Sequence, residues 1–265
     1  MILRKSLLAT SVAVAVMAVS SVNAAPFQAS NTGPAVQPSF ATPNGSTVLY
    51  DQTDSAAGNG APVQNFEASF DAYDSEGADD FVVPAGGWTV SSFNFVTTVG
   101  TPVTTTAALN VYADAAGLPG GAPVCSAAAA VADVTATGTT VTLPAPCVLG
   151  AGTYWVALTV DVNFGTNGQI FWSNRSVQTN SPGVFRNPGD GFASGCTDWA
   201  AMTTCGVGGG ASPDFLFQVV GAVGGGGEPF VPGIALPTMS QWSALLAAGG
   251  LALLGMFGLR RRARR

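Results

Sequence analysis

The stretch between residues 46 and 221 consists of short apolar segments that alternate with glycine- and proline-rich turns. The clearest segment is Tyr154–Val160, in which large apolar side chains occupy every second position. A period of two is that of a β-strand with one buried face, and the stretch lacks the three-to-four-residue period of an amphipathic helix. Short strands and turns at regular spacing are typical of a β-sandwich. We therefore predict an all-β, antiparallel, jelly-roll-like sandwich over residues 46–221.

Two segments of this body depart from simple alternation. The apolar phase shifts between Val90 and Phe93, which predicts a β-bulge near Ser91 and Ser92. The alanine-rich segment 127–132 is compatible with a single helical turn.

The segments on either side of the sandwich are rich in small and polar residues. Residues 25–45 contain proline, serine, threonine, asparagine and glycine, and we expect a mobile lead-in there. Residues 222–235 contain four consecutive glycines and two prolines, which is typical of a flexible linker.

The N-terminus carries an export signal. Arg4 and Lys5 precede a mostly apolar run, and Val22-Asn23-Ala24 places small residues at the two positions that a signal peptidase recognises. This pattern predicts a signal peptide over residues 1–24, cut after Ala24. The alternative is a retained membrane anchor, which the short apolar run disfavours.

The C-terminus carries a longer apolar span. Residues 242–259 contain no charge, and as a helix they would extend about 27 Å, close to the thickness of the hydrocarbon core. Basic residues stay on the cytoplasmic side, so the five arginines that follow would stop transfer with the body outside. They are Arg260, Arg261, Arg262, Arg264 and Arg265. The alternative, an amphipathic helix buried in the domain, does not account for this basic end.

The residues before this span resemble a bacterial sorting signal. Leu236-Pro237-Thr238-Met239-Ser240-Gln241-Trp242, the apolar span and the arginine cluster together resemble the IPTL-CTERM signal, which is similar in layout to the PEP-CTERM signals of Gram-negative bacteria. The usual opening of that signal is Ile-Pro-Thr-Leu-Ser-x-Trp, so Leu236 and Met239 depart from it. Pro237, Thr238, Ser240 and Trp242 match, and Ser243 stands where glycine is common. The resemblance implies recognition by an exosortase-like protease, removal of the tail in 236–265, and delivery to the cell surface or extracellular matrix.

Parts of the body resemble a sandwich that recurs in bacterial secreted proteins. The resemblance is carried by the strand and turn patterns of residues 79–95, 110–121 and 150–160. It implies a fold and no activity.

The charge of the exported body is strongly acidic. All fifteen acidic residues lie between Asp51 and Glu228, where Arg175 and Arg186 are the only basic residues and histidine is absent, so the net charge is −13. Such a surface repels nucleic acids and anionic lipids, and we expect neither as a partner.

The four cysteines predict disulfides, because the exported location is oxidising. Three pairings are possible, and we favour Cys125–Cys147 with Cys196–Cys205 because each closes a local loop. Each bridge would stabilise the fold by roughly 3 kcal/mol. A zinc site is the alternative, but there is no C-x-x-C pair and no histidine.

A cluster of acids between residues 67 and 80 is a candidate calcium site. Calcium takes six to eight oxygen ligands, which several carboxylates in one loop can supply. The cluster lacks the spacing of an EF-hand, and the alternative is a solvated acidic loop at a sheet edge. The acids are Glu67, Asp71, Asp74, Glu76, Asp79 and Asp80, and the last five are the candidate ligands.

Aromatic residues are the second candidate site. Trp155, Phe171, Trp172 and Trp199 could stack on sugar rings, but aromatic residues more often belong to a core. Trp199 is the best candidate, because it lies beside Asp198 in the loop between Cys196 and Cys205.

Catalysis is not expected. Without histidine, serine and cysteine triads are excluded. A carboxylate pair could cleave glycosides, but Asp79 and Asp80 are adjacent and would point to opposite faces of a strand.

These features predict an exported protein of the cell surface or extracellular matrix of a Gram-negative bacterium, with a structural or adhesive role. Its expected partners are signal peptidase, the exosortase-like protease and extracellular polysaccharide, and no cofactor other than calcium is expected. A calcium-assisted carbohydrate-binding module is the alternative, and a hydrolase is the third hypothesis.

Overall fold

The computed structural model describes residues 27–32, 39–43 and 45–225. The predicted signal peptide, the sorting motif, the apolar span 242–259 and the arginine cluster lie outside the described residues. Within the described ranges, no helix is long and apolar enough to cross a membrane.

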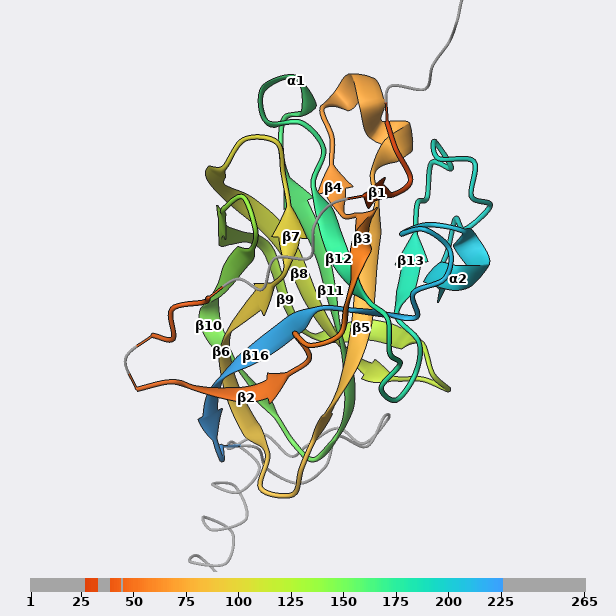
Figure 1. Ribbon diagram of the computed structural model, residues 1–265. Coiled ribbons are helices and arrows are strands. Elements are labelled where there is room, and N and C mark those ends of the chain that lie inside the picture. Colours follow the sequence, from red (N-terminus) through yellow and green to blue (C-terminus); the bar gives the residue numbers. More distant parts are fainter. Residues whose placement is uncertain (1–26, 33–38, 44, 226–265) are drawn as a thin grey trace, which may run out of the picture.

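The described chain forms two β-sheets (Figure 1). The larger sheet has eleven strands. Ten of them lie side by side in the order β14 (Ala200–Ala201), β13 (Val184–Arg186), β5 (Glu76–Val83), β11 (Gly152–Asp161), β8 (Val103–Asp114), β9 (Pro119–Val134), β10 (Thr139–Leu149), β6 (Trp88–Phe95), β16 (Phe217–Val223) and β2 (Thr47–Asp51). The eleventh, β4 (Gln64–Asn65), pairs with β11. The smaller sheet has five, in the order β1 (Asn31–Thr32), β3 (Ala56–Pro62), β12 (Phe171–Arg175) and β15 (Asp214–Phe215), with β7 (Thr97–Thr98) on β12. Within the described residues, three short helical segments complete the fold: η1 (Ala68–Tyr73), α1 (Phe164–Asn167) and α2 (Met202–Cys205).

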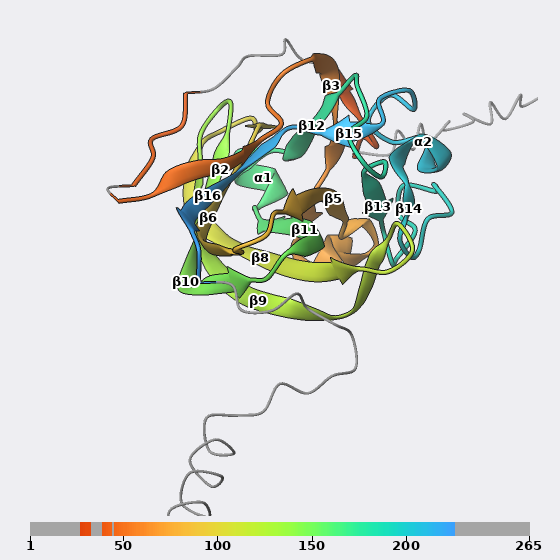
Figure 2. The ribbon, with the colours of Figure 1, turned by 90° about the horizontal axis from the view of Figure 1, so that it is seen from below.

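The strand pairs are antiparallel except for β4 with β11, so the prediction of an all-β, antiparallel fold is confirmed. The larger sheet curls, and Figure 2 shows its strands from β2 round to β5 arranged about a common interior. The rings of Tyr50 on β2 and Phe81 on β5 lie 6.3 Å apart, although these strands are far apart in the sheet order. The smaller sheet lies across the opening between β2 and β5 (Figure 2).

The alternation along β11 places its residues in two different cores. Tyr154, Val156, Leu158 and Val160 point into the main core, whereas Trp155 belongs to a second, smaller cluster on the other face of the sheet. This follows from the period of two, because neighbouring strand residues point to opposite faces.

Two of the aromatic candidates belong to the main fold. Trp172 is fully buried, stacks on Phe215 with ring centroids 4.2 Å apart, and donates its indole N–H to the carbonyl of Leu216 at 2.8 Å. Phe171 is also buried. Neither side chain can serve as an exposed sugar platform.

The predicted bulge is confirmed, and the predicted helical turn is wrong. β16 pairs with β6 through Val90 and Ser92 and skips Ser91, which is the extra residue. The segment 127–132 lies within β9, where it pairs with β8 and where Ala127, Ala130 and Ala132 are buried. Pairing with the long strand β8 overrides the weak strand preference of alanine.

The structure contains the two disulfides that we favoured. Cys125–Cys147 joins β9 to β10 with a Cα–Cα distance of 6.0 Å. Cys196–Cys205 closes the loop before and through α2 with a Cα–Cα distance of 5.7 Å. No cysteine of the described chain remains unpaired for zinc.

Part of the segment expected as a lead-in is packed on the domain. Phe27 is only 5% exposed, and its ring lies 4.4 to 4.8 Å from the rings of Phe66, Phe70, Tyr73 and Phe164. Strand β1 then pairs with β3 at the edge of the smaller sheet. Residues 27–32 therefore belong to the folded domain, in contrast to the prediction for 25–45.

Candidate functional site

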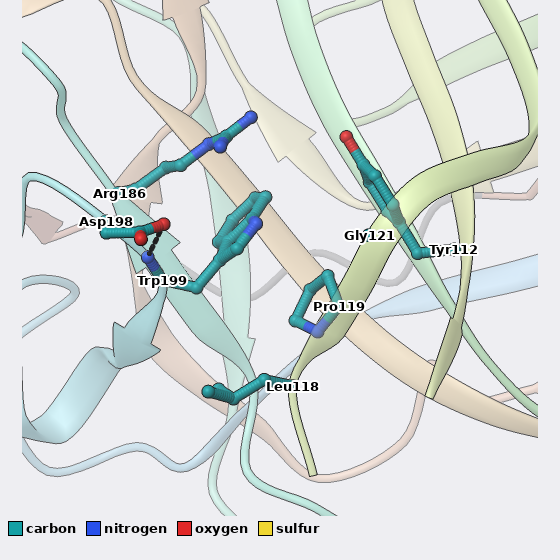
Figure 3. A pocket seen from close by; sticks show the side chains of 7 residues that line it. All are labelled: Tyr112, Leu118, Pro119, Gly121, Arg186, Asp198 and Trp199. Carbon is teal, nitrogen blue, oxygen red and sulfur yellow. Dashed lines mark hydrogen bonds between the residues drawn. The ribbon is translucent and has the colours of Figure 1, made fainter. Parts of the chain in front are cut away.

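A pocket of about 330 Å³ lies between the turn that joins β8 to β9 and the excursion that leaves the sheet after β12. Figure 3 shows the residues that line it, and we call it the Trp199 pocket. They are Tyr112, Leu118, Pro119, Gly121, Arg186, Asp198 and Trp199. The accessible surface of this lining is mainly polar, and the aromatic and apolar side chains beside it are of the kind that small-ligand sites contain.

The second hydrophobic cluster adjoins the pocket through Tyr112, which belongs to the cluster and also lines the pocket. It lies on the outer face of β5, β11 and β8, and Trp199 packs against it. Its members are Ala78, Tyr112, Trp155, Ala157 and Val184. Because Trp155 is fully buried in this cluster and does not line the pocket, it is not a sugar platform.

One wall of the pocket is the turn between β8 and β9. Asp114 accepts hydrogen bonds from the backbone N–H of Gly117 at 3.2 Å and from the indole N–H of Trp155 at 2.9 Å. Gly117 has φ of +82°, which favours glycine at this corner. These bonds fix the turn that presents Leu118 and Pro119 to the pocket.

The opposite wall comes from the excursion between β12 and β15. There β13 pairs with the edge of β5, and β14 pairs with β13. The disulfide Cys196–Cys205 closes the segment that holds Trp199, whose backbone N–H donates to Asp198 Oδ1 at 2.8 Å. The segment has little regular structure, so these cross-links determine where Trp199 lies.

Arg186 connects this wall to the sheet. It faces Glu76 across the β13–β5 pair, and its Nε and Nη2 donate to Glu76 Oε2 at 2.8 and 2.5 Å. Its guanidinium carbon lies 4.3 Å from the centroid of the Trp199 ring, a cation–π arrangement. In the view of Figure 3, the indole lies between Arg186 and the Leu118–Pro119 corner. Glu76 therefore holds Arg186, and Arg186 holds one side of Trp199.

Tyr112 supplies a neutral hydroxyl. Burial raises the pKa of Tyr112, and the nearby Glu76 carboxylate raises it further, while Arg186 opposes the shift. The phenol therefore stays protonated over the physiological range, where it can both donate and accept a hydrogen bond.

The predicted pair Asp198 and Trp199 is brought together in this pocket, where Arg186 and Tyr112 join it. The sequence analysis did not identify these two partners. One signal for Arg186 was present, because it is one of only two basic residues in the acidic body.

The predicted calcium ligands are not brought together. The described part of the chain holds no group of three or more acidic, cysteine or histidine side chains that could bind a metal. Asp71 is exposed, Asp74 accepts from the backbone N–H of Phe66 at 2.7 Å, and Glu76 binds Arg186. Asp79 and Asp80, the remaining two candidate ligands, point to opposite faces of β5 because successive strand residues alternate. The geometry therefore does not support the calcium prediction.

Asp79 and Asp80 lie on opposite faces of β5, and both are fully buried. Asp79 points inward and accepts from the side-chain amide of Gln52 at 2.9 Å and the backbone N–H of Phe215 at 2.7 Å. Asp80 points outward and accepts from the backbone N–H of Ser181 at 3.3 Å. A substrate between these two carboxylates is excluded because the sheet itself lies between them.

Burial also changes the acidity of these groups. It raises the pKa of Asp79 well above its ordinary value, and the neighbouring Asp214 carboxylate acts in the same direction. It raises the pKa of Asp80 to about 6, although hydrogen bonds from Ser181 and Asn180 oppose the shift. It also raises the pKa of Asp214 to about 6, although backbone hydrogen bonds and Arg175 oppose the shift.

No protein-family model and no curated protein matches this chain. Among solved structures, it is similar to the crystal structure of the cysteine protease and lectin-like domains of Cwp84, a surface layer associated protein of Clostridium difficile. The identity is 10% and the TM-score 0.37, over 55% of this chain and 31% of that chain. The match thus spans about a third of that protein, and a likeness of this size carries no argument about function.

Proposed function

We propose that this chain is an exported, surface-sorted protein without catalytic activity, and that it adheres to extracellular polysaccharide through the Trp199 pocket. The signal peptide and the sorting signal deliver it in this account, and the β-sandwich binds. The observation that carries the binding proposal is the fixed indole of Trp199 at a pocket of saccharide size.

The cysteines support export. All four are paired in two disulfides, and disulfides persist in oxidising compartments but are rare in the cytosol. This agrees with the N-terminal pattern, which predicts cleavage after Ala24.

The geometry of the pocket supports saccharide binding. A sugar ring has an apolar C–H face and a polar rim, which suit an aromatic ring beside hydrogen-bonding groups. Trp199 offers the ring, Pro119 and Leu118 offer further apolar surface, and Tyr112 and Asp198 offer polar groups. Because Trp199 is held by a disulfide-closed loop and by Arg186, little ordering entropy is lost on binding.

Calorimetric titration of the exported protein with neutral tetrasaccharides tests the binding proposal. We expect saturable binding, a change in tryptophan fluorescence, and loss of at least tenfold in affinity in Trp199→Ala. Val148→Ala, which truncates an exposed apolar side chain on β10, is the matched control and retains binding. A flat titration across neutral, basic and acidic oligosaccharides would refute the proposal.

Sorting requires a separate experiment in a Gram-negative host that has an exosortase-like protease. The full chain and a chain that lacks residues 236–265 are expressed, and mass spectrometry identifies the termini in each cell fraction. We expect the full chain at the surface or in the medium, without residues 1–24 and without its arginine cluster. Recovery of the full-length chain from the cytosol contradicts the proposal.

A further inference from the structure

We infer that the Trp199 pocket prefers saccharides that carry a free ammonium group over saccharides that carry carboxylates. This inference rests on the proposed function and specifies the ligand class of the same site. It follows from how the charges around the pocket are paired.

Both basic residues of the described chain already have acidic partners. Arg175, which does not line the pocket, lies 2.8 Å from Asp54 Oδ1 and 3.8 Å from Asp214 Oδ2. Arg186, the basic residue of the pocket, binds Glu76 through two nitrogens. A carboxylate sugar would therefore have to compete with Glu76 for its only cationic partner in the pocket.

Asp198 provides the opposite chemistry. Its side chain is exposed, and Oδ1 accepts one hydrogen bond, from the backbone N–H of Trp199. Oδ2 has no protein partner among the described residues. Asp198 therefore presents a carboxylate acceptor at the rim of the pocket, close to the ring on which the sugar would stack.

The net charge around the pocket also favours a cationic ligand. The ion pair of Arg186 and Glu76 is neutral as a whole, so Asp198 sets the sign of the charge that a ligand meets at the rim. A hydrogen bond between an ammonium group and a carboxylate is about twice as strong as one between neutral groups.

The expected effect is modest because the contact is exposed to solvent. We expect the ammonium group to tighten binding by about two- to fivefold relative to the neutral sugar, and a carboxylate to weaken it by a similar factor. The preference decreases as salt increases, because salt screens exposed charges.

The test uses four β-1,4-linked tetrasaccharides: glucosamine, N-acetylglucosamine, glucose and glucuronate. Each is titrated calorimetrically into the exported protein at about pH 6, in low and in high salt. The same series is repeated with Asp198→Asn, and with Asp71→Asn as a control that removes an exposed charge outside the pocket. We expect the glucosamine tetramer to bind most tightly and the glucuronate tetramer most weakly, and this order to collapse in Asp198→Asn and remain in Asp71→Asn.

Two results overturn the inference while the proposed function stands. One is equal or tighter binding of the glucuronate tetramer, and the other is an unchanged preference in Asp198→Asn. If none of the four sugars binds, both the inference and the proposed function fail.

Discussion

Strand β5 separates two clusters of buried side chains that are built in different ways. On its inner face, Phe81 and Val83 join the main core, which long paired strands enclose. On its outer face, Ala78 joins the small cluster that adjoins the Trp199 pocket. The cover of that cluster consists of strands of two and three residues, a four-residue helix and loops.

This difference shows where stability and binding reside in the molecule. The main core is held by strand hydrogen bonds and by burial of many large side chains. The outer cluster depends on a few cross-links, namely Cys196–Cys205, the pair of Arg186 with Glu76, and the stacking of Arg186 on Trp199. We therefore expect changes in the main core to alter stability and changes in the cover to alter ligand binding.

The largest effect on stability is expected from Phe81→Ala. Phe81 is fully buried and lies against aromatic rings from β2, β6, β11 and β16, so its truncation leaves a cavity and costs about 3–5 kcal/mol of unfolding free energy. Leu118→Ala, at a side chain that is 39% exposed in the pocket, should cost less than about 1 kcal/mol. Urea unfolding measures both, and similar losses for the two would contradict the division between core and cover.

The two disulfides provide the second comparison. Replacing either pair by serine should cost roughly 3 kcal/mol, because the loops are of similar length on the logarithmic scale that governs closure entropy. Cys196→Ser with Cys205→Ser should also abolish tetrasaccharide binding, since this bridge holds the segment of Trp199. Cys125→Ser with Cys147→Ser should leave binding intact at temperatures where the variant is folded. Unchanged affinity for tetrasaccharides in the variant that lacks Cys196–Cys205 would contradict the account.

The buried acids on the two faces of β5 give the third comparison. The pKa of Asp80 is about 6 in the folded protein and near 3.9 in the unfolded chain, so the folded state binds more protons between these values. Its contribution to stability is therefore fully present below about pH 4 and is lost as the pH rises through 6. Asp80→Asn should increase stability at pH 7.5 by roughly 1 kcal/mol and flatten the pH profile between 5 and 7.

Asp79→Asn serves as the contrasting variant. Asp79 accepts from the backbone N–H groups of Asp80 and Phe215 and from the amide of Gln52, and an asparagine amide group cannot accept all three bonds. This variant should lose stability at every pH. Thermal unfolding from pH 4.5 to 8 tests both, and a stabilised Asp79→Asn would show that the hydrogen-bond assignment is wrong.

A small effect on stability is also expected from Trp199→Ala. The side chain packs on the edge of the outer cluster, so truncation should cost about 1 kcal/mol or less. The affinity of this variant for tetrasaccharides should nevertheless fall at least tenfold. Trp199→Ala should thus affect binding more than stability, whereas Phe81→Ala should mainly affect stability. A large loss of stability with unchanged affinity would assign Trp199 to the fold alone.

The strand predicted most clearly is β11, in which large apolar side chains alternate without interruption. Segment 127–132 and β3 (Ala56–Pro62) were not recognised as strands, because alanine, glycine and proline carry no alternating pattern. Their structure depends on the neighbouring strands β8 and β12, with which they pair. Tertiary pairing of this kind cannot be derived from local preference.

The candidate site was predictable only where it is local in sequence. Asp198 and Trp199 are adjacent and lie within one disulfide loop, so both could be identified. Glu76 and Arg186 are separated by 110 residues and meet only because β13 pairs with β5. The calcium prediction from the acidic cluster failed for the converse reason, because side chains that are close in sequence point to opposite faces of β5.

A crystal structure of the exported protein with its tightest-binding tetrasaccharide tests the central claim most directly. We expect a sugar ring stacked on the indole of Trp199, within hydrogen-bonding distance of Asp198 or Tyr112, in the pocket beside Pro119. A saturating ligand bound on any other face, with the Trp199 pocket unchanged, would contradict the account.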